Sequence, residues 1–135
     1  MRTEPVPVGV GRRSAAWPFP LFRAVVAVQT LLVFAQAVFA GQFLSGDGAA
    51  LGLHELSGTE IITVVALAQI VAAVFVWRPG RGPWLPAVLS VVLFFAVGLQ
   101  IGMGFAGQLS VHVPLGVAIL AVLVALLVGA PRRSS

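Results

Sequence analysis

The only two histidines in the chain, His54 and His112, are the residues whose type and setting are best suited to chemistry. Each is followed four residues later by a glycine, Gly58 or Gly116. A neutral imidazole is a common metal ligand, and two imidazoles on opposite sides of an iron can serve as the axial ligands of a heme. Position i+4 of a helix lies about 40° from position i, one turn along. A glycine there would let a flat macrocycle approach the backbone.

The composition places these histidines in a membrane protein. Of the 135 residues, 59% are hydrophobic and 9% are charged, and the mean hydropathy is +1.06. Soluble domains carry about 25% charged residues, and one soluble core of this size could not hide so much apolar surface. The composition therefore excludes a water-soluble enzyme, a nucleic-acid-binding module and a disordered chain. The absence of Cys also excludes disulfides and thiolate sites.

Four apolar segments are long enough to cross the hydrocarbon layer of a membrane, which takes about 20 helical residues. They run over residues 24–44, 53–77, 84–105 and 111–128. The connections between them are short and rich in Gly or Pro, so neighbouring helices should be antiparallel. We predict an all-α, up-down four-helix membrane bundle over residues 21–131, preceded by a flexible cytoplasmic tail over residues 1–20.

The arginines predict the orientation of the bundle. All eight lie before the first span, in the middle loop or after the last span: Arg2, Arg12, Arg13, Arg23, Arg78, Arg81, Arg132 and Arg133. With four spans these segments share one side, which the positive-inside rule assigns to the cytoplasm. Asp47, Glu55 and Glu60 fall on the other side. We expect both termini to be cytoplasmic and no binding to nucleic acid, because the arginines flank spans instead of forming one patch.

Residue usage indicates a bacterial source. Lys, Asn and Tyr are absent, whereas Ala, Val, Gly, Arg and Pro are abundant. This bias is typical of a GC-rich genome. The expected location is therefore a bacterial plasma membrane, with the lipid bilayer as the chain's surroundings.

The two halves of the chain share the order of three elements. Phe-Ala-Gly-Gln occurs at residues 39–42 and 105–108, each copy precedes one histidine with its glycine, and each half closes on an apolar run with Pro and Arg. This order predicts two repeated helical hairpins, the first with a loop eight residues longer. In such a bundle the second and fourth helices are diagonal. Both imidazoles would then lie at a similar depth near the outer face.

Gln36, Gln69 and Gln100 lie well inside the predicted spans. Polar side chains in lipid are costly, and most are paired or functional. These amides could bind a histidine ring, a propionate or a quinone, although hydrogen bonds between helices are the commoner role. Because no span centre holds an acid or a base, ion-coupled transport is disfavoured.

The pattern resembles one half of the heme A synthase family. The matching stretches are Gln100-Ile101-Gly102-Met103-Gly104 before His112, and Leu53-His54-Glu55-Leu56-Ser57-Gly58. The resemblance implies a four-helix bundle whose second and fourth helices supply the histidine ligands of a heme. Members of that family carry an acid one turn before the second-helix histidine, where this chain has Leu51, and they consist of two such halves. The resemblance therefore favours heme binding over heme hydroxylation, and an enzymatic role is not favoured.

These features together predict a small membrane protein that binds one b-type heme between His54 and His112, with Gly58 and Gly116 beside the ring. Its role would be electron transfer or heme handling, in contact with a redox partner or another membrane protein. Two alternatives stay open from the residues alone. One is a cofactor-free accessory or structural four-helix protein, and the other is a small-solute transporter that works as a dimer.

Overall fold

The computed structural model describes residues 15–130, and all regular structure in that range is helical. The first long helix is α1 (Pro18–Leu44). The second is one continuous rod made of α2 (Gly48–Leu56), the π-helix η1 (Ser57–Ile62) and α3 (Thr63–Trp77), and it is followed by α4 (Leu85–Phe105) and α5 (Leu109–Gly129). Each of the four long helices is apolar and long enough to cross a membrane, which confirms the predicted four-helix membrane bundle.

The first two long helices begin earlier than the apolar segments do, at Pro18 and Gly48. The apolar segment is only the part of the helix expected to lie in hydrocarbon, whereas the helix itself extends beyond it to the capping residue. Pro18 is tolerated in a first helical turn, and Asp47 caps α2 by accepting a hydrogen bond from the amide of Ala49 at 3.0 Å. The predicted tail over residues 1–20 thus ends within the first turn of α1, and residues 1–14 lie outside the described residues.

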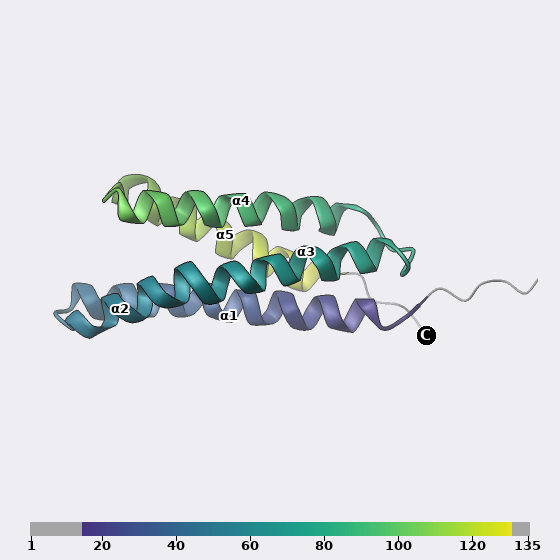
Figure 1. Cartoon of the computed structure of the whole chain (residues 1–135), viewed down its shortest axis with the longest axis horizontal. Coiled ribbons are helices and arrows are strands. Elements are labelled where there is room, and N and C mark those ends of the chain that lie inside the picture. The colour runs from purple at the N-terminus through teal and green to yellow at the C-terminus, as the bar shows by residue number, and fades with distance from the viewer. Residues whose placement is uncertain (1–14, 131–135) are drawn as a thin grey trace, which may run out of the picture.

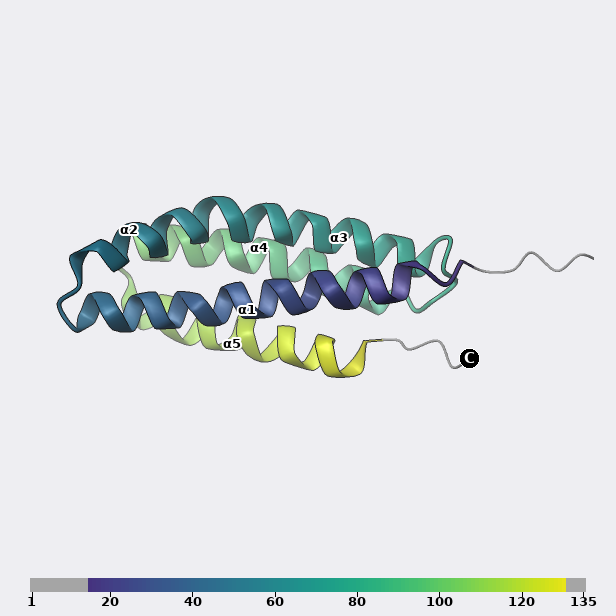
Figure 2. The same cartoon turned by 90° about the horizontal axis from the view of Figure 1, so that it is seen from below.

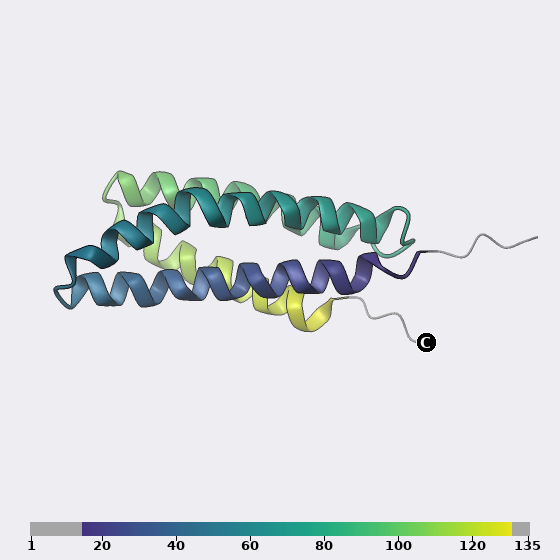
Figure 3. The same ribbon diagram turned by 60° about the horizontal axis from the view of Figure 1, so that its bottom comes forward.

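The helices alternate in direction around a square (Figure 1). α1 packs on α3 and α5, and α4 packs on the same two, so the helix containing α3 is diagonal to α5, as predicted (Figure 2). The start of α1, the α3–α4 loop and the end of α5 lie at one end, with Arg23, Arg78 and Arg81 (Figure 3). We name this the arginine end. The opposite end holds the α1–α2 and α4–α5 turns and is named the histidine end.

The bundle is apolar on its outside. Large side chains such as Leu31, Phe95 and Val128 are 68%, 69% and 72% exposed, and they are spread over all four long helices. A water-soluble bundle would bury such residues, whereas hydrocarbon solvates them. The exposed apolar belt therefore supports a lipid bilayer as the surroundings of a multi-pass protein.

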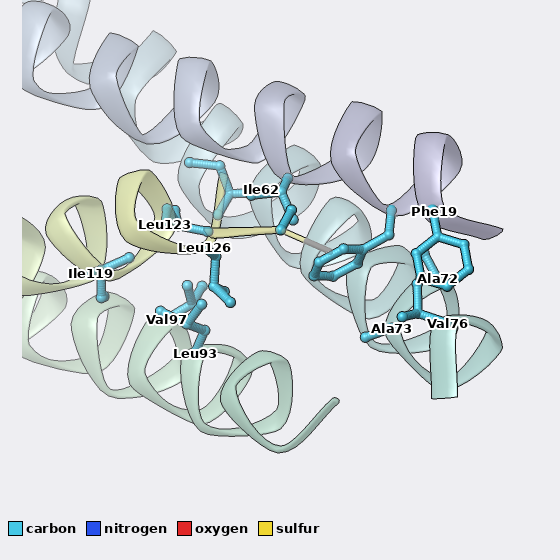
Figure 4. Close-up of a cluster of buried hydrophobic side chains, with 13 residues drawn as sticks. Phe19, Ile62, Ala72, Ala73, Val76, Leu93, Val97, Ile119, Leu123 and Leu126 are labelled. Carbon is cyan, nitrogen blue, oxygen red and sulfur yellow. The ribbon is translucent and has the colours of Figure 1, made fainter. Parts of the chain in front are cut away.

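The buried apolar cluster occupies the middle of the bundle and its arginine end (Figure 4). Its members are Phe19, Phe22, Val26, Ile62, Ala72, Ala73, Val76, Leu93, Val97, Ile119, Leu123, Leu126 and Ala130. Ala72 and Ala73 let neighbouring backbones approach closely, as small residues do in membrane bundles. Among the described residues of the histidine half, over residues 36–58 and 98–118, only Ala50 is buried. Tight apolar packing is therefore confined to one half of the molecule.

The π-helix changes which residues of the second long helix face the core. Regular helical spacing from His54 predicts Ile61, Val65 and Ala68 on the inner face, together with Gln69 and Ala72. The structure instead buries Ile62 and Ala66, so the prediction for the first three is wrong.

The reason is one additional residue in the wide turn. On a regular α-helix, Ala66 would lie about 120° around the axis from His54. Absorbing one residue in η1 removes about 100° of that rotation, so His54 and Ala66 share one face. In α5 no such turn occurs. Regular helical spacing from His112 predicts one face made of Leu115, Gly116, Ile119, Leu123 and Leu126, and the last three of these are buried whereas the first two are half-buried.

Arg23 ties the first helix to the last at the arginine end. Its Nη1 atom donates a hydrogen bond of 3.2 Å to the carbonyl oxygen of Leu127, in the last turn of α5. The last carbonyls of a helix lack partners within the helix, and the helix dipole favours a cation beside them. Arg23 thus satisfies both needs of α5 with a side chain from α1.

Replacing Arg23 with Gln should lower the free energy of unfolding by about 1 kcal/mol, the contribution expected of one such hydrogen bond. Unfolding of the purified protein by SDS, followed by circular dichroism, measures the change. Arg81→Gln is the matched control, because it removes the same charge from the exposed α3–α4 loop. Equal losses in the two variants would contradict a specific role for the contact with Leu127.

Candidate functional site

His54 and His112 meet at the histidine end. Their ring centres lie 6.0 Å apart, with 56° between the ring planes. His54 comes from α2 and His112 from the first turn of α5, and both side chains are half-buried. The pairing of the two imidazoles across the bundle is therefore a property of the fold.

Each histidine is oriented by a backbone carbonyl of the preceding long helix. The Nδ1 atom of His54 lies 3.1 Å from the carbonyl oxygen of Gln36, and Nδ1 of His112 lies 2.8 Å from that of Gln100. A carbonyl oxygen can only accept, so in both rings Nδ1 carries the hydrogen. The Nε2 atoms of the neutral rings then keep their lone pairs, the form in which an imidazole binds a metal.

The two hairpins repeat a unit of glutamine, histidine and glycine. A methyl group built on Gly58 would lie 3.4 Å from Oε1 of Gln36, and one built on Gly116 would lie 2.9 Å from Nε2 of Gln100. Each glycine therefore lies beside the side-chain amide of the same glutamine whose backbone carbonyl binds the histidine. The sequence predicts that these glycines lie beside a macrocycle. The structure shows that their nearest neighbours are the side-chain amides of Gln36 and Gln100.

The Phe-Ala-Gly-Gln match does not coincide with this unit. Residues 39–42 lie inside α1, whereas residues 105–108 begin at the last residue of α4 and continue into the turn. Gln36 and Gln100 are instead the equivalent positions, because the backbone carbonyl of each accepts from one histidine. The hairpins are related through the residues that contact the histidines.

Gly104 is a residue of the site that the sequence argument did not single out. A methyl group there would lie 3.0 Å from Cε1 and 3.1 Å from Nδ1 of His112. These distances are shorter than ordinary van der Waals contacts, so the His112 ring lies flush against the backbone of α4. A side chain at this position would require the ring to shift by a few tenths of an ångström.

The polar residues farther along the bundle do not join the histidines. Gln69 is buried and donates to Oγ of Ser90 at 3.2 Å, and Ser90 donates to the carbonyl of Pro86. This is the hydrogen bond between helices that was the favoured role for Gln69. Glu55 and Glu60 are exposed at the histidine end. The site therefore consists of the two rings and the groups that hold them.

The ring separation fits one metal between two imidazoles. Metal–imidazole bonds of about 2.0–2.1 Å, plus about 1.1 Å from each nitrogen to its ring centre, would place two rings on opposite sides of one metal about 6.3 Å apart. The observed separation is 6.0 Å. Within residues 15–130 no group of three or more His, Cys, Asp or Glu side chains could hold a metal ion. The protein offers two ligands, so further ligands would have to arrive with the metal.

No protein-family model, curated protein sequence or solved structure matches this chain. The likeness to the heme A synthase family is therefore carried by the two quoted motifs, and it stays a prediction.

Replacing Gly104 with Ala should displace the His112 ring and weaken its hydrogen bond to Gln100, because the new methyl group would lie closer to the ring than ordinary van der Waals contact allows. Proton–nitrogen correlation spectra tuned to imidazole couplings would show this as loss of the protected Nδ1–H signal of His112. Gly102→Ala is the matched control, since Gly102 lies two residues earlier and nothing lies within 4 Å of a methyl group there. An unchanged His112 signal in Gly104→Ala would contradict the contact.

Proposed function

We propose that this protein binds one b-type heme between His54 and His112 and serves electron transfer or heme handling in a bacterial plasma membrane. The observation that carries the proposal is the pair of neighbouring imidazoles, whose ring centres lie 6.0 Å apart and whose Nδ1 atoms each lie within hydrogen-bond distance of a backbone carbonyl. That arrangement leaves one lone pair on each ring for a metal. It comes from two helices that are diagonal in the bundle.

The number of protein ligands favours a heme over a bare metal ion. Structural zinc takes four protein ligands, and catalytic zinc sites take three. The two histidines supply two, with no cluster of three or more among the described His, Cys, Asp and Glu side chains. A porphyrin would bring four nitrogen ligands of its own, so His54 and His112 would complete the ligand set of its iron.

The packing of the bundle also supports a ligand at this end. The described residues around the histidines are half-buried or exposed, with Ala50 as the single buried residue of that half, whereas the other half is tightly packed. A flat apolar ring bound between the hairpins would cover apolar surface that the helices do not cover for one another. Such burial stabilises by about 25 cal/mol per Å².

The chain's own groups would orient and tune the ligands. The carbonyls of Gln36 and Gln100 fix the tautomer and rotation of each imidazole, and such bonds raise the basicity of a metal-bound histidine. When bound, the heme would supply a site for one-electron transfer. With His54 and His112 both bound to the iron, electron transfer would be favoured over binding of an exchangeable ligand. Leu51 stands where heme A synthases carry an acid, which favours a role other than heme hydroxylation.

The arginines supply the proposed orientation. Arg23, Arg78 and Arg81 lie at the end opposite the histidines, and the positive-inside rule would place that end in the cytoplasm. The heme would then lie near the outer face of the membrane. A redox partner on that side, or a second membrane protein, would exchange the electron.

Absorbance of the purified protein from 350 to 700 nm tests the proposal. We expect a Soret band, either as isolated or after heme is added, and a shift of that band on reduction. His54→Ala and His112→Ala should each abolish the bis-imidazole spectrum, because each removes one axial ligand.

The control for these variants is Glu55→Gln, which changes an exposed neighbour of His54 and should leave the spectrum intact. A folded protein that stays colourless with added heme would overturn the proposal. It would instead favour the cofactor-free accessory or structural protein.

A further inference from the structure

Two glutamines of α1 hold the two ends of the π-helix. Nε2 of Gln36 donates to Oγ of Ser57, the first residue of η1, at 2.6 Å. Nε2 of Gln29 donates to the carbonyl oxygen of Ile62, the last residue of η1, at 3.3 Å. Seven residues on an α-helix complete almost two full turns, so both amides project from one face of α1.

Gln29 is deeply buried, with 2% of its surface exposed, and its hydrogen bond joins residues 33 positions apart. A polar side chain in such a place is retained at a cost unless it is paired. Its partner here is a main-chain group at the point where the π turn gives way to α3. π turns are uncommon and are frequently found at functional sites.

The π turn determines where His54 points. Without the additional residue, His54 and the buried stripe that begins at Ala66 would lie about 120° apart around the helix. If α3 kept its packing, His54 would then turn away from His112. Gln29 acts on the one segment whose geometry decides between these two arrangements.

We propose that Gln29 is a positioning residue that stabilises the π turn and thereby directs His54 toward His112. The inference rests on the proposed heme site, because the aim of His54 matters there as that of an axial ligand. It assigns Gln29 a role in the site although Gln29 contacts neither histidine. The role is exercised through the backbone of η1.

The test uses a distance that does not require heme. The chain has no native Cys, so Leu53→Cys and Val113→Cys can carry a pair of nitroxide labels beside the two histidines. Both positions are exposed, at 52% and 59%. Pulsed electron paramagnetic resonance of the full chain in lipid nanodiscs then reports the rotation of α2 relative to α5.

Gln29→Leu keeps the volume of the side chain and removes the donor. We expect the label distance to shift by up to about 8 Å, since one residue's rotation of about 100° moves a side chain by that much at the helix surface. Gln69→Leu is the matched control. Gln69 is equally buried, at 1% exposure, but bonds to Ser90 and not to η1, so its variant should keep the parent distance.

Deletion of Thr59 provides the second arm. Removing one residue from η1 should turn it into a regular α-helix while leaving His54 and Ala66 in phase, so the parent distance should be retained. In that background Gln29→Leu should have no effect on the distance, because no π turn is left to hold. A residue that merely fills the core would show the same effect in both backgrounds.

Two results would overturn the proposal: a parent-like distance in Gln29→Leu, or a displaced distance in the Thr59 deletion with Gln29 intact. Heme spectra of the same variants are read separately. A colourless parent protein would remove the proposed function and leave the role of Gln29 in aiming His54 to be decided by the labels.

Discussion

The hydrogen-bonding needs of a few amide and imidazole groups in an apolar bundle govern the arrangement of its histidine end. Away from water, a buried polar group is costly unless it is hydrogen-bonded. Gln36 meets this need twice, through its side chain on Ser57 and through its backbone carbonyl on His54. Gln100 accepts from His112 in the same way. Apolar packing contributes little here, so these bonds fix the helices that carry the rings.

The two hairpins reach one geometry by different routes. Gln36 and His54 are 18 residues apart, whereas Gln100 and His112 are 12 apart. The second hairpin turns tightly after α4, and Gly104 lets the His112 ring lie against the backbone. The first hairpin has longer helices, and the π turn that follows His54 brings it onto the same face as Ala66. Both halves share the contact of a histidine ring with a glutamine backbone carbonyl, although the chain between the two residues differs in length.

Sequence reasoning reached the fold and the pairing of the histidines because both follow from coarse properties. Apolar length gives the spans, and histidines near the outer ends of the second and fourth spans lie at a similar depth on diagonal helices. It failed for Ile61, Val65 and Ala68 because it assumed a constant 3.6 residues per turn, and nothing in the local pattern announces a π turn. Gln29 and Gly104 were passed over for a related reason. Their roles depend on which backbone atoms lie opposite them, and that information exists only in the folded chain.

The buried apolar core lies in one half of the molecule and the histidine contacts lie in the other, and this division has a physical consequence for function. Burial of Phe22, Val26, Leu123 and their neighbours at the arginine end holds the four helices together without help from the histidines. At the histidine end, by contrast, hydrogen bonds of fixed direction hold the rings, and few side chains are fully buried. A site that must admit a flat ligand needs this combination, because a ring cannot enter a close-packed core. In the proposed heme site, stability and ligand geometry would thus be carried by different ends of the same four helices, which are joined through Gln29 and the π turn.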